Sequence, residues 1–124
     1  MTRALLVAAA GALGALVRYG LGLAVGPVTF PWVTLVINVT GAFVLGAVLT
    51  LAPARHWSAD ISTPIAVGFL GAYTTFSTFS WETVVLGRVD GRWAAAAAYV
   101  VASVVLGIGA AWGGHSVARS VAAR

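Results

Sequence analysis

Long stretches without a charged side chain are the feature that most constrains the fold of this chain. Four such stretches cover residues 4–17, 19–54, 61–81 and 93–118, with His115 as the one titratable group in the last of them. A helix needs about 20 predominantly apolar residues to cross a membrane. Only 8% of the residues are charged, against roughly 25% in a soluble domain. The sequence therefore predicts an integral membrane protein.

The longest uncharged stretch is too long for one crossing, and turn residues divide it. Gly26-Pro27 and Pro31 lie within it, and such residues are turn signals. Division at this point predicts an all-α membrane protein with four transmembrane helices, at about 4–25, 32–52, 62–85 and 93–117. The short connections leave little mass outside the membrane. We therefore expect residues 1–124 to form a single integral membrane domain.

The distribution of arginines is the sequence signal for orientation, because cytoplasmic loops are enriched in Lys and Arg. The predicted topology puts four arginines on one side and two on the other: Arg3, Arg55, Arg119 and Arg124 against Arg88 and Arg92. This bias is too weak to decide between two arrangements. Either the chain has one fixed orientation, or it inserts both ways and pairs with its own inverted copy.

The first helix is predicted to stay in the protein and to pack closely against another helix. Its apolar residues continue past Arg18 without a polar cleavage region, unlike those of a signal peptide. Gly14, Gly22 and Gly26 share the face of Arg18, and small residues at this spacing let two backbones approach in lipid. Packing inside one four-helix bundle or a dimer interface would account for them, and the short helices favour a dimer.

Residues that would carry enzymatic chemistry are missing, so we do not expect an enzyme. The chain has no cysteine, and its two histidines lie near the ends of predicted spans, where they form no metal cluster. There is no Ser–His–Asp set, phosphate loop or dinucleotide fingerprint. The seven basic residues are scattered singly, so no nucleic-acid partner is expected.

A few polar residues inside the predicted spans need partners or water, because polar groups are costly in hydrocarbon. Arg18 either snorkels to the headgroups or draws anions to the mouth of a path. Asn38 either forms a hydrogen bond between helices or lines a pore. Glu82 either belongs to such a path or marks the membrane boundary. Tyr99 and Ser103 share a helix face and extend a polar track, unless Tyr99 is an interfacial anchor.

The segment from Gly68 to Glu82 is the most unusual part of the sequence. Two glycines precede hydroxyl residues at positions 74, 75, 77, 78 and 80. Serine and threonine can bond back to their own helix, so an uninterrupted helix is one alternative. A helix broken near mid-membrane, where its freed backbone groups meet protein, an ion or water, is the other. Phe76 and Phe79 share a face, and their ring edges carry partial positive charge that suits an anion. Ordinary packing against lipid or core is the alternative for both rings.

This same segment carries a family resemblance. The string GFLGAYTTFSTFSWE, residues 68–82, closely resembles the third-helix signature of the CrcB/Fluc fluoride channels. The likeness extends to GALGALVRYG at 11–20 and TLVINVTGAFVLG at 34–46, and so covers essentially the whole chain. It implies an antiparallel, dual-topology dimer in the plasma membrane of a prokaryote, with two pores at its interface. The implied function is passive, fluoride-selective export that relieves fluoride toxicity, by a homodimer or with a paired homologous subunit.

The resemblance also implies roles for individual residues. It assigns six of them to the fluoride pore: Asn38, Phe76, Thr78, Phe79, Tyr99 and Ser103. Arg18 would lie in the vestibule and Glu82 near the pore. Main-chain carbonyls of Gly71 and Thr74, from both subunits, would bind one structural sodium ion at the dimer centre.

Two positions depart from the family pattern. Gly107 stands where a second serine often follows the first in the fourth helix, which puts the outer end of the polar track in doubt. Tyr73 replaces a smaller residue within the third-helix signature.

Two other classes of membrane protein remain as alternatives. A small four-helix, proton-coupled multidrug exporter would need an acid deep in the membrane, whereas the first predicted helix has none and Glu82 lies near the end of its span. A non-transporting assembly subunit would leave the polar third span unexplained.

Overall fold

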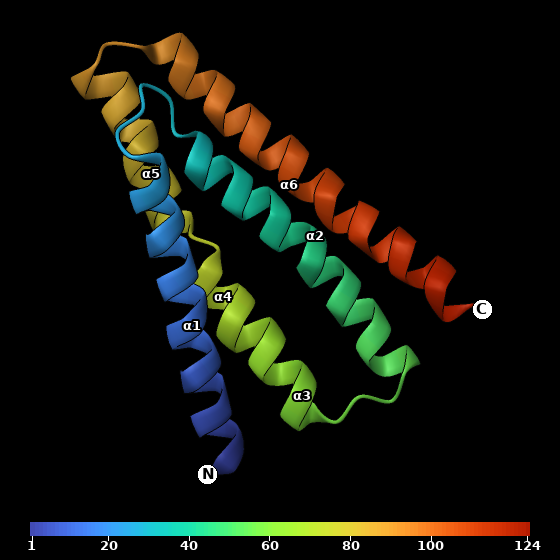
Figure 1. The fold of residues 1–124 in the computed structure, drawn as a ribbon. Helices are drawn as coiled ribbons and strands as arrows, with labels where there is room; N and C mark the ends of the chain where they lie inside the picture. The colour runs from blue at the N-terminus through green and yellow to red at the C-terminus, as the bar shows by residue number, and fades with distance from the viewer.

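The structure is a computed structural model that describes all residues from 1 to 124, and it consists of four helical rods without strands (Figure 1). The first rod is α1 (Thr2–Val25), the second is α2 (Trp32–Ala54) and the last is α6 (Trp93–Ala122). The third rod is made of five consecutive pieces: α3 (Ala59–Thr63), η1 (Pro64–Leu70), α4 (Gly71–Tyr73), α5 (Phe76–Val84) and η2 (Val85–Val89). The predicted all-helical architecture is confirmed.

The helices α1, α2 and α6 are each long and apolar enough to cross a membrane. Their bounds extend beyond those predicted, most clearly at α6, which runs to Ala122 instead of 117. The third rod begins at Ala59 and ends at Val89, outside the predicted 62–85. The prediction followed apolar residues alone, whereas a helix continues past the hydrocarbon as long as its backbone groups pair within it.

The helices α2 and α6 approach each other through glycines, and they lie side by side along much of their length (Figure 1). A Cβ atom on Gly46 would meet the carbonyl oxygen of Ala111 in α6. A Cβ atom on Gly114 would meet the carbonyl oxygen of Phe43 in α2. The two backbones are therefore in direct contact at two sites, as small residues allow in lipid.

The helix α1 packs in the same way against η1 and α4. A Cβ atom on Gly14 would meet the carbonyl oxygen of Phe69, and one on Gly68 would lie 2.7 Å from the carbonyl oxygen of Val7. Packing within the chain thus accounts for Gly14. It does not account for Gly22, which has no neighbour within 4 Å of its Cβ position.

The interior is small, as expected for a chain whose apolar side chains face lipid. Only 17 of 124 residues are buried. In water, the burial of so few side chains could not hold this fold together. One core cluster joins α2, η2 and α6 through Leu35, Leu86, Ala96 and Tyr99. This cluster lies beside the segment that carries the candidate functional residues.

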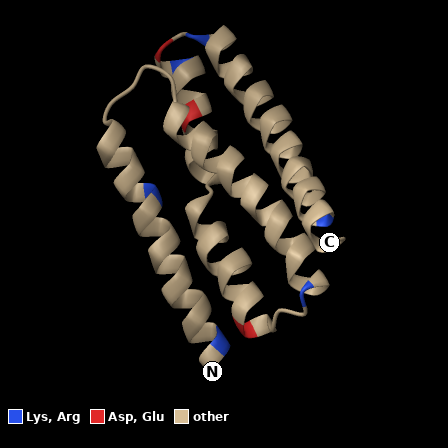
Figure 2. Cartoon of the chain, turned by 45° about the vertical axis from the view of Figure 1, so that its right-hand side comes forward, with Lys and Arg blue, Asp and Glu red and all other residues tan.

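Most charged residues lie at the two ends of the rods, and the middle is nearly free of them (Figure 2). One ion pair is present: the Nε of Arg3 lies 2.7 Å from Oδ1 of Asp60. It ties the N-terminal end of α1 to α3, at the same end of the molecule. Both side chains are exposed, so this pair contributes little to stability.

The glycine contact between α2 and α6 leads to a first prediction. Gly114→Ala should lower the free energy of unfolding by about 1–3 kcal/mol, because its methyl group overlaps the Phe43 carbonyl and forces the helices apart. Thermal unfolding of the purified protein in detergent, followed by circular dichroism, measures the change. Gly109→Ala is the matched control, since its Cβ position is open and alanine favours helix. Equal loss of stability in both variants would contradict the packing described.

Candidate functional site

The third rod is interrupted between α4 and α5, at Thr74 and Thr75. Thr74 has a ψ angle of 158°, and Thr75 has φ and ψ angles of −151° and 114°, so both are extended. Threonine side chains cap both helix ends. The hydroxyl of Thr74 donates to the Leu70 carbonyl at 2.9 Å, and the hydroxyl of Thr75 accepts from the Thr78 amide at 3.1 Å. We call residues 74–75 the interruption.

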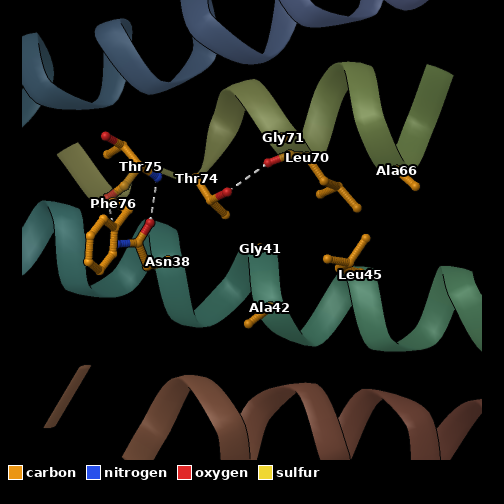
Figure 3. A pocket seen from close by; sticks show the side chains of 10 residues that line it. All are labelled: Asn38, Gly41, Ala42, Leu45, Ala66, Leu70, Gly71, Thr74, Thr75 and Phe76. Atoms are coloured by element: carbon orange, nitrogen blue, oxygen red, sulfur yellow. Dashed lines mark hydrogen bonds between the residues drawn. The ribbon is translucent and has the colours of Figure 1, made fainter. Parts of the chain in front are cut away.

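Asn38 of α2 satisfies the backbone of the interruption (Figure 3). Its Oδ1 accepts from the Thr75 amide at 2.8 Å, and its Nδ2 donates to the Thr75 carbonyl at 3.1 Å. Both backbone groups of Thr75 thus gain partners that no helix supplies there. Asn38 therefore forms a hydrogen bond between rods, which was one of its two alternatives. The second N–H of its side-chain amide has no partner.

Two carbonyls at the interruption lose their usual helical donors. The Thr75 amide bonds Asn38 and the Thr74 amide bonds Leu70, so neither donates to the Gly71 carbonyl. The Thr78 amide bonds the Thr75 hydroxyl, and no backbone amide donates to the Thr74 carbonyl. These carbonyls of Gly71 and Thr74 are available to another ligand.

Arg18 of α1 approaches the interruption from the opposite side. Its Nε donates to the Ala72 carbonyl at 3.2 Å. This bond directs the guanidinium toward the third rod, which disfavours the snorkelling alternative. It also occupies a carbonyl that lies between those of Gly71 and Thr74.

A groove with a volume of about 300 Å³ lies between α2 and the third rod (Figure 3). Its lining includes Asn38, Gly71, Thr74 and Phe76. Gly41 makes the close approach of the rods possible, because a Cβ atom there would meet the methyl group of Thr74. We call this the central groove, and the residues that carry the available carbonyls line it together with the asparagine and one aromatic ring.

The two phenylalanines of the third rod lie together but in different surroundings. Their ring centroids are 5.6 Å apart, with an angle of 45° between the planes. Phe76 is 79% exposed. Phe79 is half-buried and lies 5.1 Å from the ring of Tyr99. The two rings therefore extend from the outer surface of the molecule to the core cluster.

Glu82 is hydrogen-bonded to two hydroxyl groups from other rods. Its Oε1 accepts from the hydroxyl of Thr34 at 2.8 Å, and its Oε2 accepts from the hydroxyl of Tyr99 at 2.7 Å. Tyr99 is fully buried, which excludes the interfacial-anchor alternative. The carboxylate thus links α2, α5 and α6.

Thr34 is a residue that the sequence reasoning missed. It lies four residues before Asn38, on the same face of α2, and this spacing was the one available signal. A lone threonine near the start of a helix is common, so its pairing with Glu82 becomes visible only in three dimensions.

A second hollow, with a volume of about 370 Å³, lies between α1, α2 and α5. Five of its lining residues are polar: Arg18, Thr34, Thr75, Thr78 and Glu82. We call it the polar hollow. The structure thus brings Arg18, Thr78 and Glu82 together on one side of the interruption. The central groove lies on another side, and Thr75 lines both.

Ser103 is placed apart from these hollows. It lies one turn beyond Tyr99 on α6, and its hydroxyl oxygen is buried without a hydrogen-bond partner. Gly107, one turn further, has no neighbour within 4 Å of its Cβ position. No other group of this chain therefore replaces the serine expected there.

The double hydrogen bond of Asn38 leads to a second prediction. Asn38→Ala should lower the free energy of unfolding by about 2–4 kcal/mol, because both backbone groups of Thr75 lose their partners. Thr83→Ala is the control, since its hydroxyl bonds the carbonyl of Phe79 in its own helix and no group of another rod. Chemical unfolding in mixed detergent micelles measures both. A similar loss in the two variants would show that Asn38 does not hold the interruption.

Comparison with known proteins identifies relatives over nearly the whole chain. The family model described as "CrcB-like protein, Camphor Resistance (CrcB)" matches residues 5–115. A protein of Geobacillus kaustophilus named fluoride-specific ion channel FluC 2 is 46% identical over 121 residues, which are 93% of this chain and 92% of the relative. A FluC protein of Nitrobacter winogradskyi is 46% identical over 123 residues, 94% of this chain and 95% of the relative.

A relative of lower identity matches slightly more of the chain. The FluC protein of Geobacter sulfurreducens is 40% identical over 125 aligned positions, covering 98% of this chain and all of the relative. The resemblance seen in residues 68–82 is therefore confirmed over nearly the whole chain. This chain belongs to the CrcB family.

Proposed function

We propose that this protein is a passive, fluoride-selective channel that exports cytoplasmic fluoride and so relieves fluoride toxicity. The observation that carries the proposal is the near full-length match to bacterial proteins named fluoride-specific ion channels, at 40–47% identity. These relatives are ion channels by name and not enzymes. Three helices able to cross a membrane support a multi-pass protein in a prokaryotic membrane.

The chemistry of the site suits a small, strongly hydrated anion. A selective path must replace the hydration shell of the ion, yet bind it weakly enough for release. Amide, hydroxyl and ring-edge donors can do this without a formal positive charge. Asn38 has a remaining N–H, Thr78 lines the polar hollow, and Phe76 presents an exposed ring. Phe79 and Ser103 continue this set of neutral groups toward α6, whereas the hydroxyl of Tyr99 donates to Glu82.

Two inverted copies of the chain would complete the channel, with a pore on each side of their interface. The central groove is open in the single chain, and Phe76 at its edge is largely exposed. A second copy packed there would cover both. The four-to-two distribution of arginines between the ends is compatible with insertion in either orientation. A homodimer is the simplest assembly, and a paired homologous subunit would use the same surface.

The interruption would lie near mid-membrane and bind a sodium ion. Residues 74–75 fall near the middle of the third rod, which runs from 59 to 89. The carbonyls of Gly71 and Thr74 lack their helical donors, and oxygen is the donor atom that hard cations prefer. These residues would hold the ion together with their counterparts in the second copy. The bound ion would supply positive charge that ties the two copies together.

A proton-coupled multidrug exporter is not favoured. That mechanism needs a carboxylate that exchanges a proton with the substrate. The only acid within the rods away from their ends is Glu82, and both of its oxygens already accept hydrogen bonds from Thr34 and Tyr99. No relative described above is named as an exporter of this kind.

The function is tested with purified protein in liposomes loaded with fluoride or with chloride, read by ion-selective electrodes. We expect rapid fluoride release and no chloride release above that of protein-free liposomes. Release of neither anion, together with dye export driven by a proton gradient, would overturn the proposal in favour of the exporter.

The role of Phe76 gives a third prediction. Phe76→Ile should reduce the rate of fluoride release by roughly tenfold or more, because an aliphatic side chain lacks the positive ring edge. A barrier to passage that is higher by about 1.4 kcal/mol already slows release tenfold. The same liposome assay measures the rate. Phe43→Ile in α2 is the matched control, since this ring lies 3.8 Å from where a Cβ atom on Gly113 of α6 would be and does not line the central groove.

Dimer formation separates a pore effect from a failure of assembly in this test. Phe76→Ile should give the same fraction of cross-linked dimer as the unchanged protein. An unchanged fluoride rate with intact assembly would remove Phe76 from the pore.

A further inference from the structure

The C-terminal end of α6 extends beyond the length that a membrane crossing requires. The helix has 30 residues, or about 45 Å, against roughly 30 Å of hydrocarbon. Trp93 and Trp112 are 62% and 72% exposed and lie about 28 Å apart along the helix axis. Exposed tryptophans mark the two membrane–water interfaces. The residues after Trp112 therefore lie at headgroup level on one side of the membrane.

One face of this extension is polar and slightly hollowed. The hollow has a volume of about 450 Å³ and is lined by residues three or four apart along α6: Trp112, His115, Ser116, Arg119, Ser120 and Ala123. A cation, an imidazole and two hydroxyls thus follow directly after an interfacial tryptophan. This hollow, which we call the α6 headgroup site, lies outside the central groove and the polar hollow.

The contact with α2 fixes the tautomer of His115. The hydroxyl of Thr50 donates its single proton to the Gly46 carbonyl at 2.7 Å. It must then accept from Nδ1 of His115, which lies 2.8 Å away. The ring is held by this bond, and Nε2 is left as its free polar atom.

The positive charge at this end of α6 is not neutralised by a carboxylate. Arg119 has no ion-pair partner, because the one ion pair of the chain joins Arg3 to Asp60. Arg55 donates from Nη2 to the Val121 carbonyl at 3.1 Å. This second guanidinium offsets the negative end of the helix dipole, which would otherwise repel an anion from the site.

The hydroxyls of the α6 headgroup site complement this charge. Ser116 and Ser120 donate to the carbonyls of Trp112 and Ser116, at 2.9 and 3.1 Å. Their oxygens therefore remain as acceptors. A phosphate suits Arg119, and a headgroup hydroxyl suits the serine oxygens.

From this arrangement we infer that the α6 headgroup site binds an anionic phospholipid, with its phosphate on Arg119, a headgroup hydroxyl donating to Nε2 of His115 or to the serine oxygens, and its acyl chains beside Trp112. Phosphatidylglycerol has both the single negative charge and the free hydroxyls that the site matches. The inference concerns lipid recognition and does not depend on which ion the protein conducts.

Lipid retention by the full-length protein tests the inference. Protein in detergent is mixed with phosphatidylglycerol or with phosphatidylcholine of the same acyl chains, and native mass spectrometry gives the fraction that carries lipid. We expect retention of phosphatidylglycerol well above that of phosphatidylcholine. Arg119→Gln should weaken phosphatidylglycerol retention roughly fivefold, as expected for one arginine at an anionic surface. Arg88→Gln, at the other end of the molecule, should not.

Three further measurements keep this test decisive. Arg119→Lys should restore most of the retention, because it keeps the charge, and thermal unfolding checks that each variant is folded. Inorganic phosphate at equal concentration should leave the lipid bound. Equal retention by Arg119→Gln and the unchanged protein, or equal retention of both lipids, would overturn the inference. Displacement by phosphate would show that a free anion, and not a lipid, occupies the site.

Discussion

The need to pair every backbone group away from water is the constraint on which the rest of this structure depends. A continuous helix pairs these groups within itself. Thr74 and Thr75 are extended, so backbone groups near them in the third rod lack helical partners. Asn38 of α2 pairs both backbone groups of Thr75 through two hydrogen bonds, whereas the carbonyls of Gly71 and Thr74 stay without helical donors. The position of α2 relative to the third rod is thus fixed by a polar contact at the candidate functional site.

Close backbone packing supports this contact. In lipid the hydrophobic effect does not drive helices together, so van der Waals contact between small residues becomes important. Gly41 lets the interruption lie against α2, and Gly14 lets α1 lie against the third rod. These two glycines also determine where polar side chains lie. They bring Asn38 and Arg18 within hydrogen-bond distance of main-chain carbonyls on two sides of the third rod.

The sequence predicted the helical architecture well, because long uncharged stretches and turn residues are local signals. It also pointed to Asn38, Phe76 and Thr78, since polar or aromatic groups in an apolar span stand out individually. The partners of these groups were harder to predict. Thr34 resembles any threonine at a helix start, and its bond to Glu82 joins residues 48 positions apart. Periodicity shows which residues share a face, but not which face of another helix lies opposite.

The paired glycine contacts between α2 and α6 have a mechanical consequence. At Gly46 and Gly114 each backbone touches the other, so sliding one helix along its neighbour would drive a side chain into a carbonyl. The two helices must therefore shift or tilt as one rigid body. Asn38 and Thr34 are part of that body on α2, and Tyr99 is part of it on α6. Phe76 lies on the third rod, so its position relative to this rigid pair is set by the contacts that Asn38 and Gly41 of α2 make with the interruption.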